Sequence, residues 1–136
     1  DSVASRGLGD VYKRQLKDVP KTLVYRLAHW RNLQQEIIPP GIISRAPSAE
    51  LAEGQVDQDS LPPYEVLDEI LYRLIELKQS SEAIVQAGFD ETTVQRISRL
   101  LKFNEYKRRQ TAPGPRISEG AFGLDWRYPL AHGFKY

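Results

Sequence analysis

The sequence of 136 residues contains no cysteine. Disulfide bonds, thiolate metal sites and cysteine nucleophiles are therefore excluded within this chain. Its two histidines, His29 and His132, have no partner at metal-ligand spacing. The sequence also lacks a glycine-rich phosphate loop and a nucleophile elbow. We therefore expect no catalytic residue and no metal site in this chain.

Long apolar runs are absent as well. None approaches the roughly 18 residues that a helix needs to cross a bilayer, and no signal-peptide pattern opens the sequence. We therefore expect a cytoplasmic protein without a membrane partner. Charged residues at 27% and hydrophobic residues at 40% are typical of a soluble globular chain, and the length suits one domain.

Charge is distributed unevenly, although the net charge is only +1. Residues 47–69 carry seven acidic residues and no lysine or arginine. Residues 96–116 carry seven cations and one acidic residue, Glu105. Two interpretations stand side by side: the segments attract each other across the fold, or they divide a polyanionic, metal-bearing ligand between them.

The stretch 90–116 organises the rest of the chain. Asp90 is suited to cap a helix, because its carboxylate accepts the unpaired amides of a first turn. Apolar residues at three- and four-residue steps then predict a buried stripe: Val94, Ile97, Leu100 and Leu101. We expect this helix to run through Lys107, Arg108 and Arg109 until Pro113 stops it. These cations are either a solvated basic face or an anion site for phosphate or carboxylate.

An earlier helix is predicted from Pro20, whose fixed φ suits the first helical position. Its predicted buried face consists of Leu23, Val24, Leu27, Ala28 and Trp30. Lys21 lies in the first turn, where a cation opposes the helix dipole. Lys21 is either an ordinary surface lysine or, together with the free amides beside it, a binding site for phosphate.

The middle of the chain predicts a turn, a short extended segment and a long loop. Proline and glycine mark the turn after Ile37, and residues 42–45 are expected to form a short strand or extended edge. Residues 46–60 are polar, acidic and without period, which we interpret as a loop that orders around a ligand. Within it, Asp57 and Asp59 belong either to a solvated acidic loop or to a Mg²⁺ site.

Three helices joined by short turns are expected to form a small bundle-like cap. The first begins near Tyr64, and its apolar stripe consists of Tyr64, Leu67, Ile70, Leu71 and Leu74. Ser80 or Ser81 caps the second, and Gly88 ends it in a left-handed conformation. The helix that begins at Asp90 is the third. The tail, 117–129, is rich in glycine and aromatic residues and is expected to form an irregular strap over the core.

The turn at Gly88, followed by a basic helix, also has the spacing of a helix-turn-helix, a nucleic-acid-binding module. The cations lie at the far end of that helix, however, and its N-terminal part holds Glu91, Thr92 and Thr93 instead of base-reading cations. We therefore favour no nucleic-acid partner. A non-catalytic helical interaction module is a further alternative, and it would bind neither nucleotide nor DNA.

Five segments of the sequence carry a specific resemblance when they are taken in order. They are KDVPKTLVY (17–25), PSAEL (47–51), QDSLPPY (58–64), NEYKRRQ (104–110) and AFGLDWRYP (121–129). Together they resemble the C-terminal part of the synthetase domain of glutamine-dependent NAD⁺ synthetase, in particular the long, two-domain bacterial form.

The resemblance implies a fold and a reaction. The fold is an α/β doubly wound, Rossmann-like domain of the ATP-pyrophosphatase type, of which this chain would hold mainly helices and loops, with most of the sheet missing. The reaction is that of a ligase: ATP converts deamido-NAD⁺ to an adenylate, and ammonia from a glutaminase domain then gives the amide of NAD⁺. The resemblance also implies Mg²⁺ with the ATP, bound by ligands outside this chain, and a homo-oligomer in the full enzyme.

The resemblance also assigns residues to ATP. Lys21 matches a family lysine that contacts ATP, and Ser48 matches a hydroxyl for the ATP phosphate. Ser48 falls in a loop that closes over the reacting groups, and Glu50 and Asp59 lie in the same closing loop.

Further residues are assigned to the second substrate. Lys107 matches the lysine that binds deamido-NAD⁺, and Tyr106 stands beside it. From the resemblance we expect Lys21, Ser48 and Lys107, which are remote in sequence, to converge on one cavity for an adenylated dinucleotide.

Parts of the family pattern have no match in this sequence. These are a Ser-Gly-Gly-x-x-Ser pyrophosphate loop, the upstream Mg²⁺ carboxylates and the glutaminase domain. Residues 1–15 do not match the segment expected before Leu16, and we interpret them as a foreign or disordered N-terminus. Residues 16–136 are then the C-terminal part of the synthetase domain, which we expect to be inactive alone.

Overall fold

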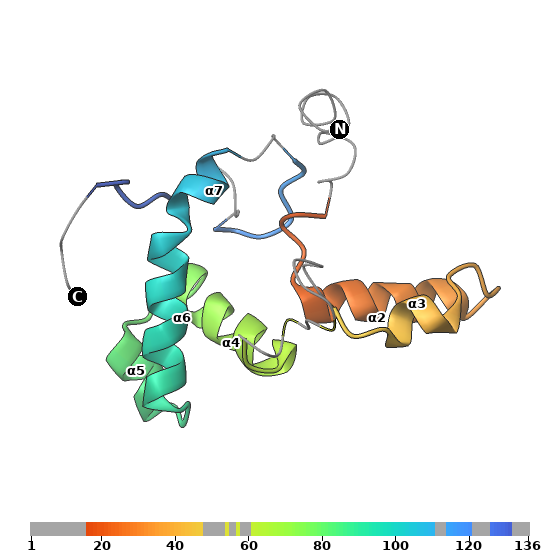
Figure 1. Cartoon of the computed structure of the whole chain (residues 1–136), viewed down its shortest axis with the longest axis horizontal. Helices are drawn as coiled ribbons and strands as arrows, with labels where there is room; N and C mark the ends of the chain where they lie inside the picture. Colours follow the sequence, from red (N-terminus) through yellow and green to blue (C-terminus); the bar gives the residue numbers. More distant parts are fainter. Residues whose placement is uncertain are drawn as a thin grey trace. The chain divides into compact units, whose positions relative to one another are not determined.

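The computed structural model describes residues 16–47, 54, 57, 61–110, 114–120 and 126–131. Regular structure in these residues is helical and includes no strand. In chain order the helices are α2 (Lys21–Asn32), α3 (Pro40–Ser44), α4 (Tyr64–Ile75), α5 (Ser81–Gln86), α6 (Glu91–Phe103) and α7 (Glu105–Arg109), as Figure 1 shows. The predicted mainly helical character is thus confirmed for the described residues.

The chain divides into two compact units. One consists of Pro20–Glu69, and the other consists of Asp1–Val19 together with Ile70–Tyr136. The boundary between them falls inside α4. No helix in the described ranges has both the length and the hydropathy that crossing a membrane requires.

In the unit Pro20–Glu69, interactions between neighbouring residues set both ends of α2. Pro20 stands directly before the helix, and its carbonyl accepts the amide of Val24 at 3.0 Å. At the other end, the Asn32 side chain accepts the amides of Ile37 and Ile38 at 3.1 and 3.0 Å and donates to the Ile38 carbonyl at 2.7 Å. Both the predicted helix start and the predicted turn are therefore present.

The apolar stripe of α2 is not buried, so the predicted buried face is wrong. No residue of α2 is buried, and the exposed fractions of Leu27 and Trp30 are 45% and 66%. Close packing between described helices joins α5 to α6 and α6 to α7. A stripe indicates which face of a helix can be buried, but burial also needs a partner surface, and no described helix packs closely on this face.

The predicted strand at residues 42–45 is also wrong, because these residues lie at the end of α3 and just after it. Pro40 occupies the start of this short helix, where its fixed φ is already helical and its missing amide hydrogen costs nothing. An extended segment needs a neighbouring strand for its hydrogen bonds. The described residues contain none, so the local preference of Pro40 decides the conformation.

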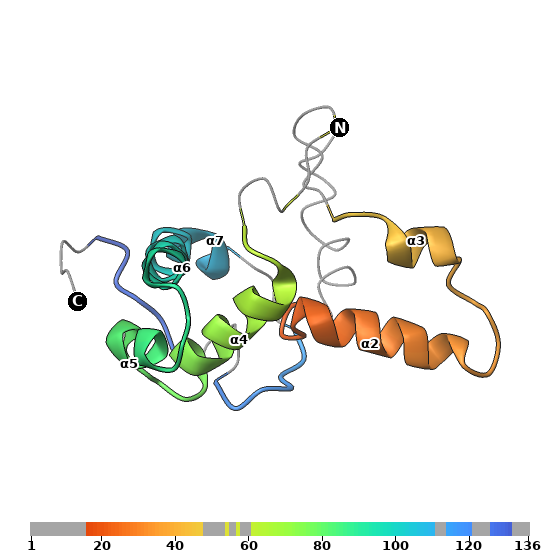
Figure 2. The same cartoon turned by 90° about the horizontal axis from the view of Figure 1, so that it is seen from below.

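The second unit has a small apolar core. Among the described residues of this unit, the buried apolar side chains are Ile70, Ile84, Val94 and Ile97. The helices α5 and α6 lie side by side in both views (Figures 1 and 2), and the hydroxyls of Ser81 and Ser98 meet between them at 3.1 Å. Ile70, Val94 and Ile97 belong to the predicted stripes, so sequence periodicity placed most of this core.

Both predicted helix caps in this unit are confirmed. The Ser80 hydroxyl accepts the Ala83 amide at 3.2 Å, and the Asp90 carboxylate accepts the Thr93 amide at 2.8 Å. Hydrogen bonds from the Thr93 hydroxyl and amide lower the pKa of Asp90. Gly88, with φ of +102°, occupies the predicted left-handed position after α5.

The helix predicted from Asp90 through Arg109 is interrupted at Asn104. The Asn104 backbone leaves the helical conformation, with ψ of 10°, and the Asn104 side chain donates to the Leu100 carbonyl at 2.8 Å. α6 therefore ends at Phe103 and α7 begins at Glu105. The single continuous helix was wrong, and the basic residues occupy a separate helix of five residues.

Described parts of the tail are irregular, as predicted, and the carboxylates of Asp18 and Glu76 hold part of it. Asp18 accepts the amides of Ile117 and Ser118 at 2.8 and 2.9 Å, and also the Ser118 hydroxyl at 3.0 Å. The Gly120 amide donates to Glu76 at 2.7 Å. The tail thus gains its order from side chains far away in sequence instead of from regular structure.

Candidate functional site

Lys21 lies in the first turn of α2 between two aromatic rings. Its Nζ atom is 5.6 Å from the ring centroid of Tyr25 and 5.9 Å from that of Tyr64. A ring face attracts a cation, so the two tyrosines favour one position of this flexible side chain. Lys21 therefore differs from an ordinary surface lysine, because its aromatic neighbours direct the ammonium group.

The predicted phosphate site made by Lys21 and the amides beside it is wrong in one part. The Thr22 amide donates to the Asp68 carboxylate at 2.8 Å, so this amide already has a partner. Asp68 also places a negative charge at the positive end of the helix dipole of α2. The lysine side chain remains a candidate for binding an anion, but the Thr22 amide does not contribute to such a site.

Tyr64 connects Lys21 to the predicted closing loop. Its hydroxyl donates to the Asp57 carboxylate. Burial first, and then this hydrogen bond, raise the pKa of Tyr64. The Asp57 backbone spans the loop as well, because its amide donates to the Pro47 carbonyl at 2.8 Å and its carbonyl accepts the Leu61 amide at 2.9 Å. Asp57 thereby links both ends of the predicted loop to the tyrosine beside Lys21.

The other predicted loop residues, Ser48, Glu50 and Asp59, lie outside the described residues. Sequence reasoning placed Tyr64 only in a core stripe and considered Asp57 only as a possible Mg²⁺ ligand. Among the described residues, no group of three histidine, aspartate or glutamate side chains is arranged to hold a metal ion.

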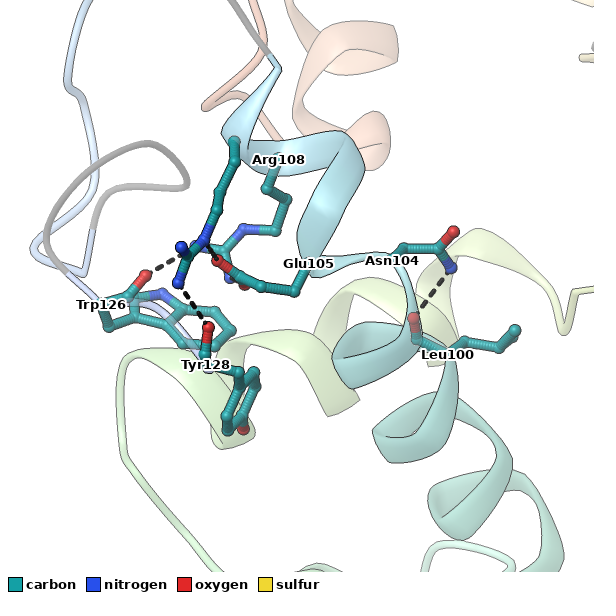
Figure 3. A network of polar contacts seen from close by, with 7 residues as sticks. Leu100, Asn104, Glu105, Arg108, Trp126 and Tyr128 are labelled. Carbon is teal, nitrogen blue, oxygen red and sulfur yellow. Dashed lines mark hydrogen bonds and ion pairs between the residues drawn. The ribbon is translucent and has the colours of Figure 1, made fainter. Parts of the chain in front are cut away.

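The second candidate cluster surrounds α7, where a buried ion pair holds the helix (Figure 3). Glu105 and Arg108 are buried, with exposed fractions of 1% and 4%, and their side chains meet at 2.8 Å. Arg109 contacts the same carboxylate at 3.4 Å. Burial lowers the pKa of Arg108, and the charge of Glu105 opposes that shift.

The two arginines also bind backbone carbonyls in the C-terminal segment 126–128. Arg108 donates to the Trp126 carbonyl at 2.9 Å, and its guanidinium lies 3.9 Å from the centroid of the Trp126 ring. Arg109 donates to the Tyr128 carbonyl at 2.8 Å. The prediction of one cluster of cations for an external anion is therefore wrong for Arg108 and Arg109, because carbonyl and carboxylate oxygens of the same chain already bind their guanidinium groups.

Lys107 and Tyr106 lie on the other side of α7. Both are exposed, and the Lys107 ammonium is 5.9 Å from the Tyr106 ring centroid. Lys107 and Arg109 are both exposed on α7, but Arg109 is bound to Glu105 and to the Tyr128 carbonyl, whereas Lys107 lies beside the Tyr106 ring. Lys21 and Lys107 belong to different units, and their convergence on one cavity with Ser48 stays a prediction.

Comparisons with known proteins agree on one family. A family model described as NAD synthase matches residues 7–111. A glutamine-dependent NAD(+) synthetase from Xanthomonas campestris is 54% identical over 121 residues, which cover 88% of this chain and 22% of that protein. The protein of the same name from Synechocystis is 52% identical over 119 residues, covering 88% of this chain and 21% of the relative.

Among solved structures, glutamine-dependent NAD⁺ synthetase from Acinetobacter baumannii in complex with ADP matches with a TM-score of 0.51 and 44% identity. The match covers 84% of this chain and 19% of that one. The chain spans about a fifth of the length of the curated relatives it matches. Because the family model covers most of its residues, the chain belongs to the NAD synthase family.

Proposed function

We propose that this chain is the C-terminal part of the synthetase domain of a glutamine-dependent NAD⁺ synthetase. The observation that carries the proposal is the identity of about half of the aligned residues, over 88% of the chain, with proteins of that name. The parallel sheet, the pyrophosphate loop and the glutaminase domain would lie in the rest of the enzyme. The complete enzyme would be a cytoplasmic homo-oligomer.

The proposed reaction is the amidation of deamido-NAD⁺. The nicotinate carboxylate attacks the α-phosphorus of ATP, pyrophosphate leaves, and an acyl adenylate forms. Ammonia from the glutaminase domain attacks the acyl carbon, AMP leaves, and loss of a proton gives the amide of NAD⁺. Negative charge develops on phosphate oxygens in the first step, so fixed cations near them lower its barrier.

Lys21 is proposed to contact ATP. The rings of Tyr25 and Tyr64 favour one position of its ammonium group, and a group held in place loses less entropy on binding. The link from Tyr64 to Asp57 supports a closing loop that forms beside Lys21 and carries Ser48, Glu50 and Asp59. Such a loop would exclude water, which would otherwise hydrolyse the adenylate.

Lys107 and Tyr106 are proposed to bind deamido-NAD⁺. The exposed ammonium of Lys107 suits the pyrophosphate or carboxylate of this substrate, since α7 leaves it facing solvent. ATP would be used with Mg²⁺. No group among the described residues fits a metal site. The metal ligands are proposed to lie in the remainder of the enzyme, and no step through this chain depends on them.

The test is Lys107→Ala in the complete synthetase. We expect the KM for deamido-NAD⁺ to rise by at least about tenfold, because the roughly 1.5–3 kcal/mol that is typical of a hydrogen bond to a charged group corresponds to about 10- to 150-fold. Glutamine hydrolysis should continue, because the glutaminase domain does not contain Lys107. An unchanged KM for deamido-NAD⁺ would exclude Lys107 from the substrate site.

A further inference from the structure

Helix α7 is too short to fix its own direction. It has five residues, and no side chain caps its N-terminus, because the Asn104 amide group points back to the Leu100 carbonyl of α6. Isolated helices shorter than about 12–15 residues are marginal in water. The orientation of α7, and of the side chains that it exposes, must therefore come from the contacts of its buried face.

The two faces of α7 differ sharply. Successive residues of a helix are rotated by about 100°, so Glu105, Arg108 and Arg109 share one face. Lys107 projects from the opposite face, and Tyr106 lies at the side between the two. The first face is bound to the Trp126 and Tyr128 carbonyls, whereas 44% of Tyr106 is exposed and Lys107 is exposed as well.

Trp126 contributes to this arrangement through its ring face. The Arg108 guanidinium lies 3.9 Å from the ring centroid, and the Tyr128 ring meets the Trp126 ring edge-on at 5.2 Å (Figure 3). The indole Nε1–H of Trp126 is buried and has no hydrogen-bond partner in the structure described. Within the Trp126 side chain, the aromatic face and not the N–H group thus holds Arg108, in addition to the backbone carbonyl that accepts from Arg108.

We propose that Trp126 is a positioning residue for deamido-NAD⁺: it stacks on Arg108, fixes α7 through the buried Arg108–Glu105 pair, and so sets the direction of Lys107 on the opposite face. The inference rests on the proposed function, because it takes Lys107 as the substrate contact. It gives a segment of the tail a role in substrate binding, although that segment need not touch the substrate.

Two variants of similar size separate the aromatic face from apolar bulk in the complete synthetase. Trp126→Phe keeps a ring under Arg108 and removes the unpartnered N–H group, so we expect a KM for deamido-NAD⁺ within about twofold of the wild-type value. Trp126→Leu keeps apolar volume but removes the ring, and we expect a rise of roughly tenfold, because a small misplacement of a binding group is costly. The KM for ATP and the rate of glutamine hydrolysis should not change.

A double-mutant cycle tests whether Trp126 acts through Lys107. If it does, Trp126→Leu has no further effect on the KM in the Lys107→Ala background, and the two changes are not additive. Additive effects would overturn the proposal. So would equal behaviour of the Leu and Phe variants, or a rise of the KM for ATP together with that for deamido-NAD⁺, which indicates general loss of structure.

The outcomes also separate this proposal from the proposed function. An unchanged KM for deamido-NAD⁺ in Lys107→Ala alone contradicts the proposed substrate site itself. A raised KM in Lys107→Ala with a wild-type KM in Trp126→Leu retains the site and overturns only the positioning role. If Trp126→Leu does not give folded enzyme, Arg108→Lys replaces it: the ion pair with Glu105 can remain, the planar stacking is lost, and the same selective rise is expected.

Discussion

At the scale of single residues, Tyr64 serves two neighbours with different parts of its side chain. The hydroxyl donates to Asp57, and the ring faces the Lys21 ammonium. Because the two contacts use separate atoms, a single substitution can remove one and leave the other.

Tyr64→Phe is expected to release Asp57 and to leave Lys21 in place. Amide hydrogen exchange in the complete enzyme should become faster at Leu61, whose amide donates to the Asp57 carbonyl. Exchange in α2 should not change, since the ring remains beside Lys21. Tyr64→Leu is the matched control, because it removes both contacts and should affect both segments. Equal exchange at Leu61 in the wild type and in Tyr64→Phe would contradict the link.

The same contact predicts a pH dependence. The pKa of Tyr64 is raised above the ordinary tyrosine value, so the folded state favours the protonated phenol. The stabilisation is complete below the unfolded pKa of about 10 and is lost as the pH rises through the higher folded value. Ultraviolet titration of tyrosinate should therefore show one late-ionising tyrosine that is missing from Tyr64→Phe.

At the scale of elements, two glycines with open space around them make opposite predictions. A Cβ atom would meet nothing within 4 Å at Gly41 or at Gly88, but Gly88 has φ of +102° and Gly41 lies in helix α3. Gly88→Ala should destabilise the turn between α5 and α6 by about 1–2 kcal/mol, because an L-residue is strained there. Gly41→Ala should stabilise α3 by about 0.5–1 kcal/mol.

Amide exchange of the two segments in the complete enzyme measures both effects as changes in local opening free energy. The pair controls for volume, since both substitutions add the same methyl group into free space. A loss of protection at Gly41→Ala equal to that at Gly88→Ala would show that backbone conformation is not the cause.

Elements whose limits depend on local chemistry could be predicted from the sequence. Ser80, Asp90 and Gly88 act on amides or dihedral angles within a few residues, so their pattern is sufficient. The break at Asn104 was not predictable in this way. Asparagine disfavours a helix interior only weakly, and α7 is held by Trp126, which lies 18 residues beyond Arg108.

The site shows the same division. The substrate roles of Lys21 and Lys107 were assigned through the resemblance, whereas their surroundings depend on contacts that no short pattern encodes. Asp68 reaches the Thr22 amide across 46 residues of sequence. A cluster of three consecutive basic residues indicates a basic surface, but the burial of Arg108 beside Glu105 is visible only in the fold.

At the scale of the whole molecule, the described part of the chain has little buried apolar surface of its own. The buried apolar side chains among the described residues are Ile70, Ile84, Val94 and Ile97, while large apolar residues such as Trp30 and Leu33 are exposed. Exposed apolar surface of this kind is normally covered in a native protein. The proposed remainder of the synthetase is the natural cover.

The isolated chain is therefore expected to form no NAD⁺ from ATP, deamido-NAD⁺ and ammonia, and to bind the dye ANS strongly. The complete synthetase should form NAD⁺ and bind little dye, because its sheet would cover the apolar helix faces. Enzyme assays and dye fluorescence at equal protein concentration check both expectations. Formation of NAD⁺ by the isolated chain would contradict the proposal that the rest of the enzyme is required.

The Asp18 carboxylate, with both amide partners in the tail, has a consequence for biosynthesis. Ser118 follows Asp18 by 100 residues, and a ribosome adds about 5–20 residues per second. The acid therefore emerges roughly 5–20 s before these tail partners are made. This part of the protein can close only late in translation, after the intervening helices have left the ribosome.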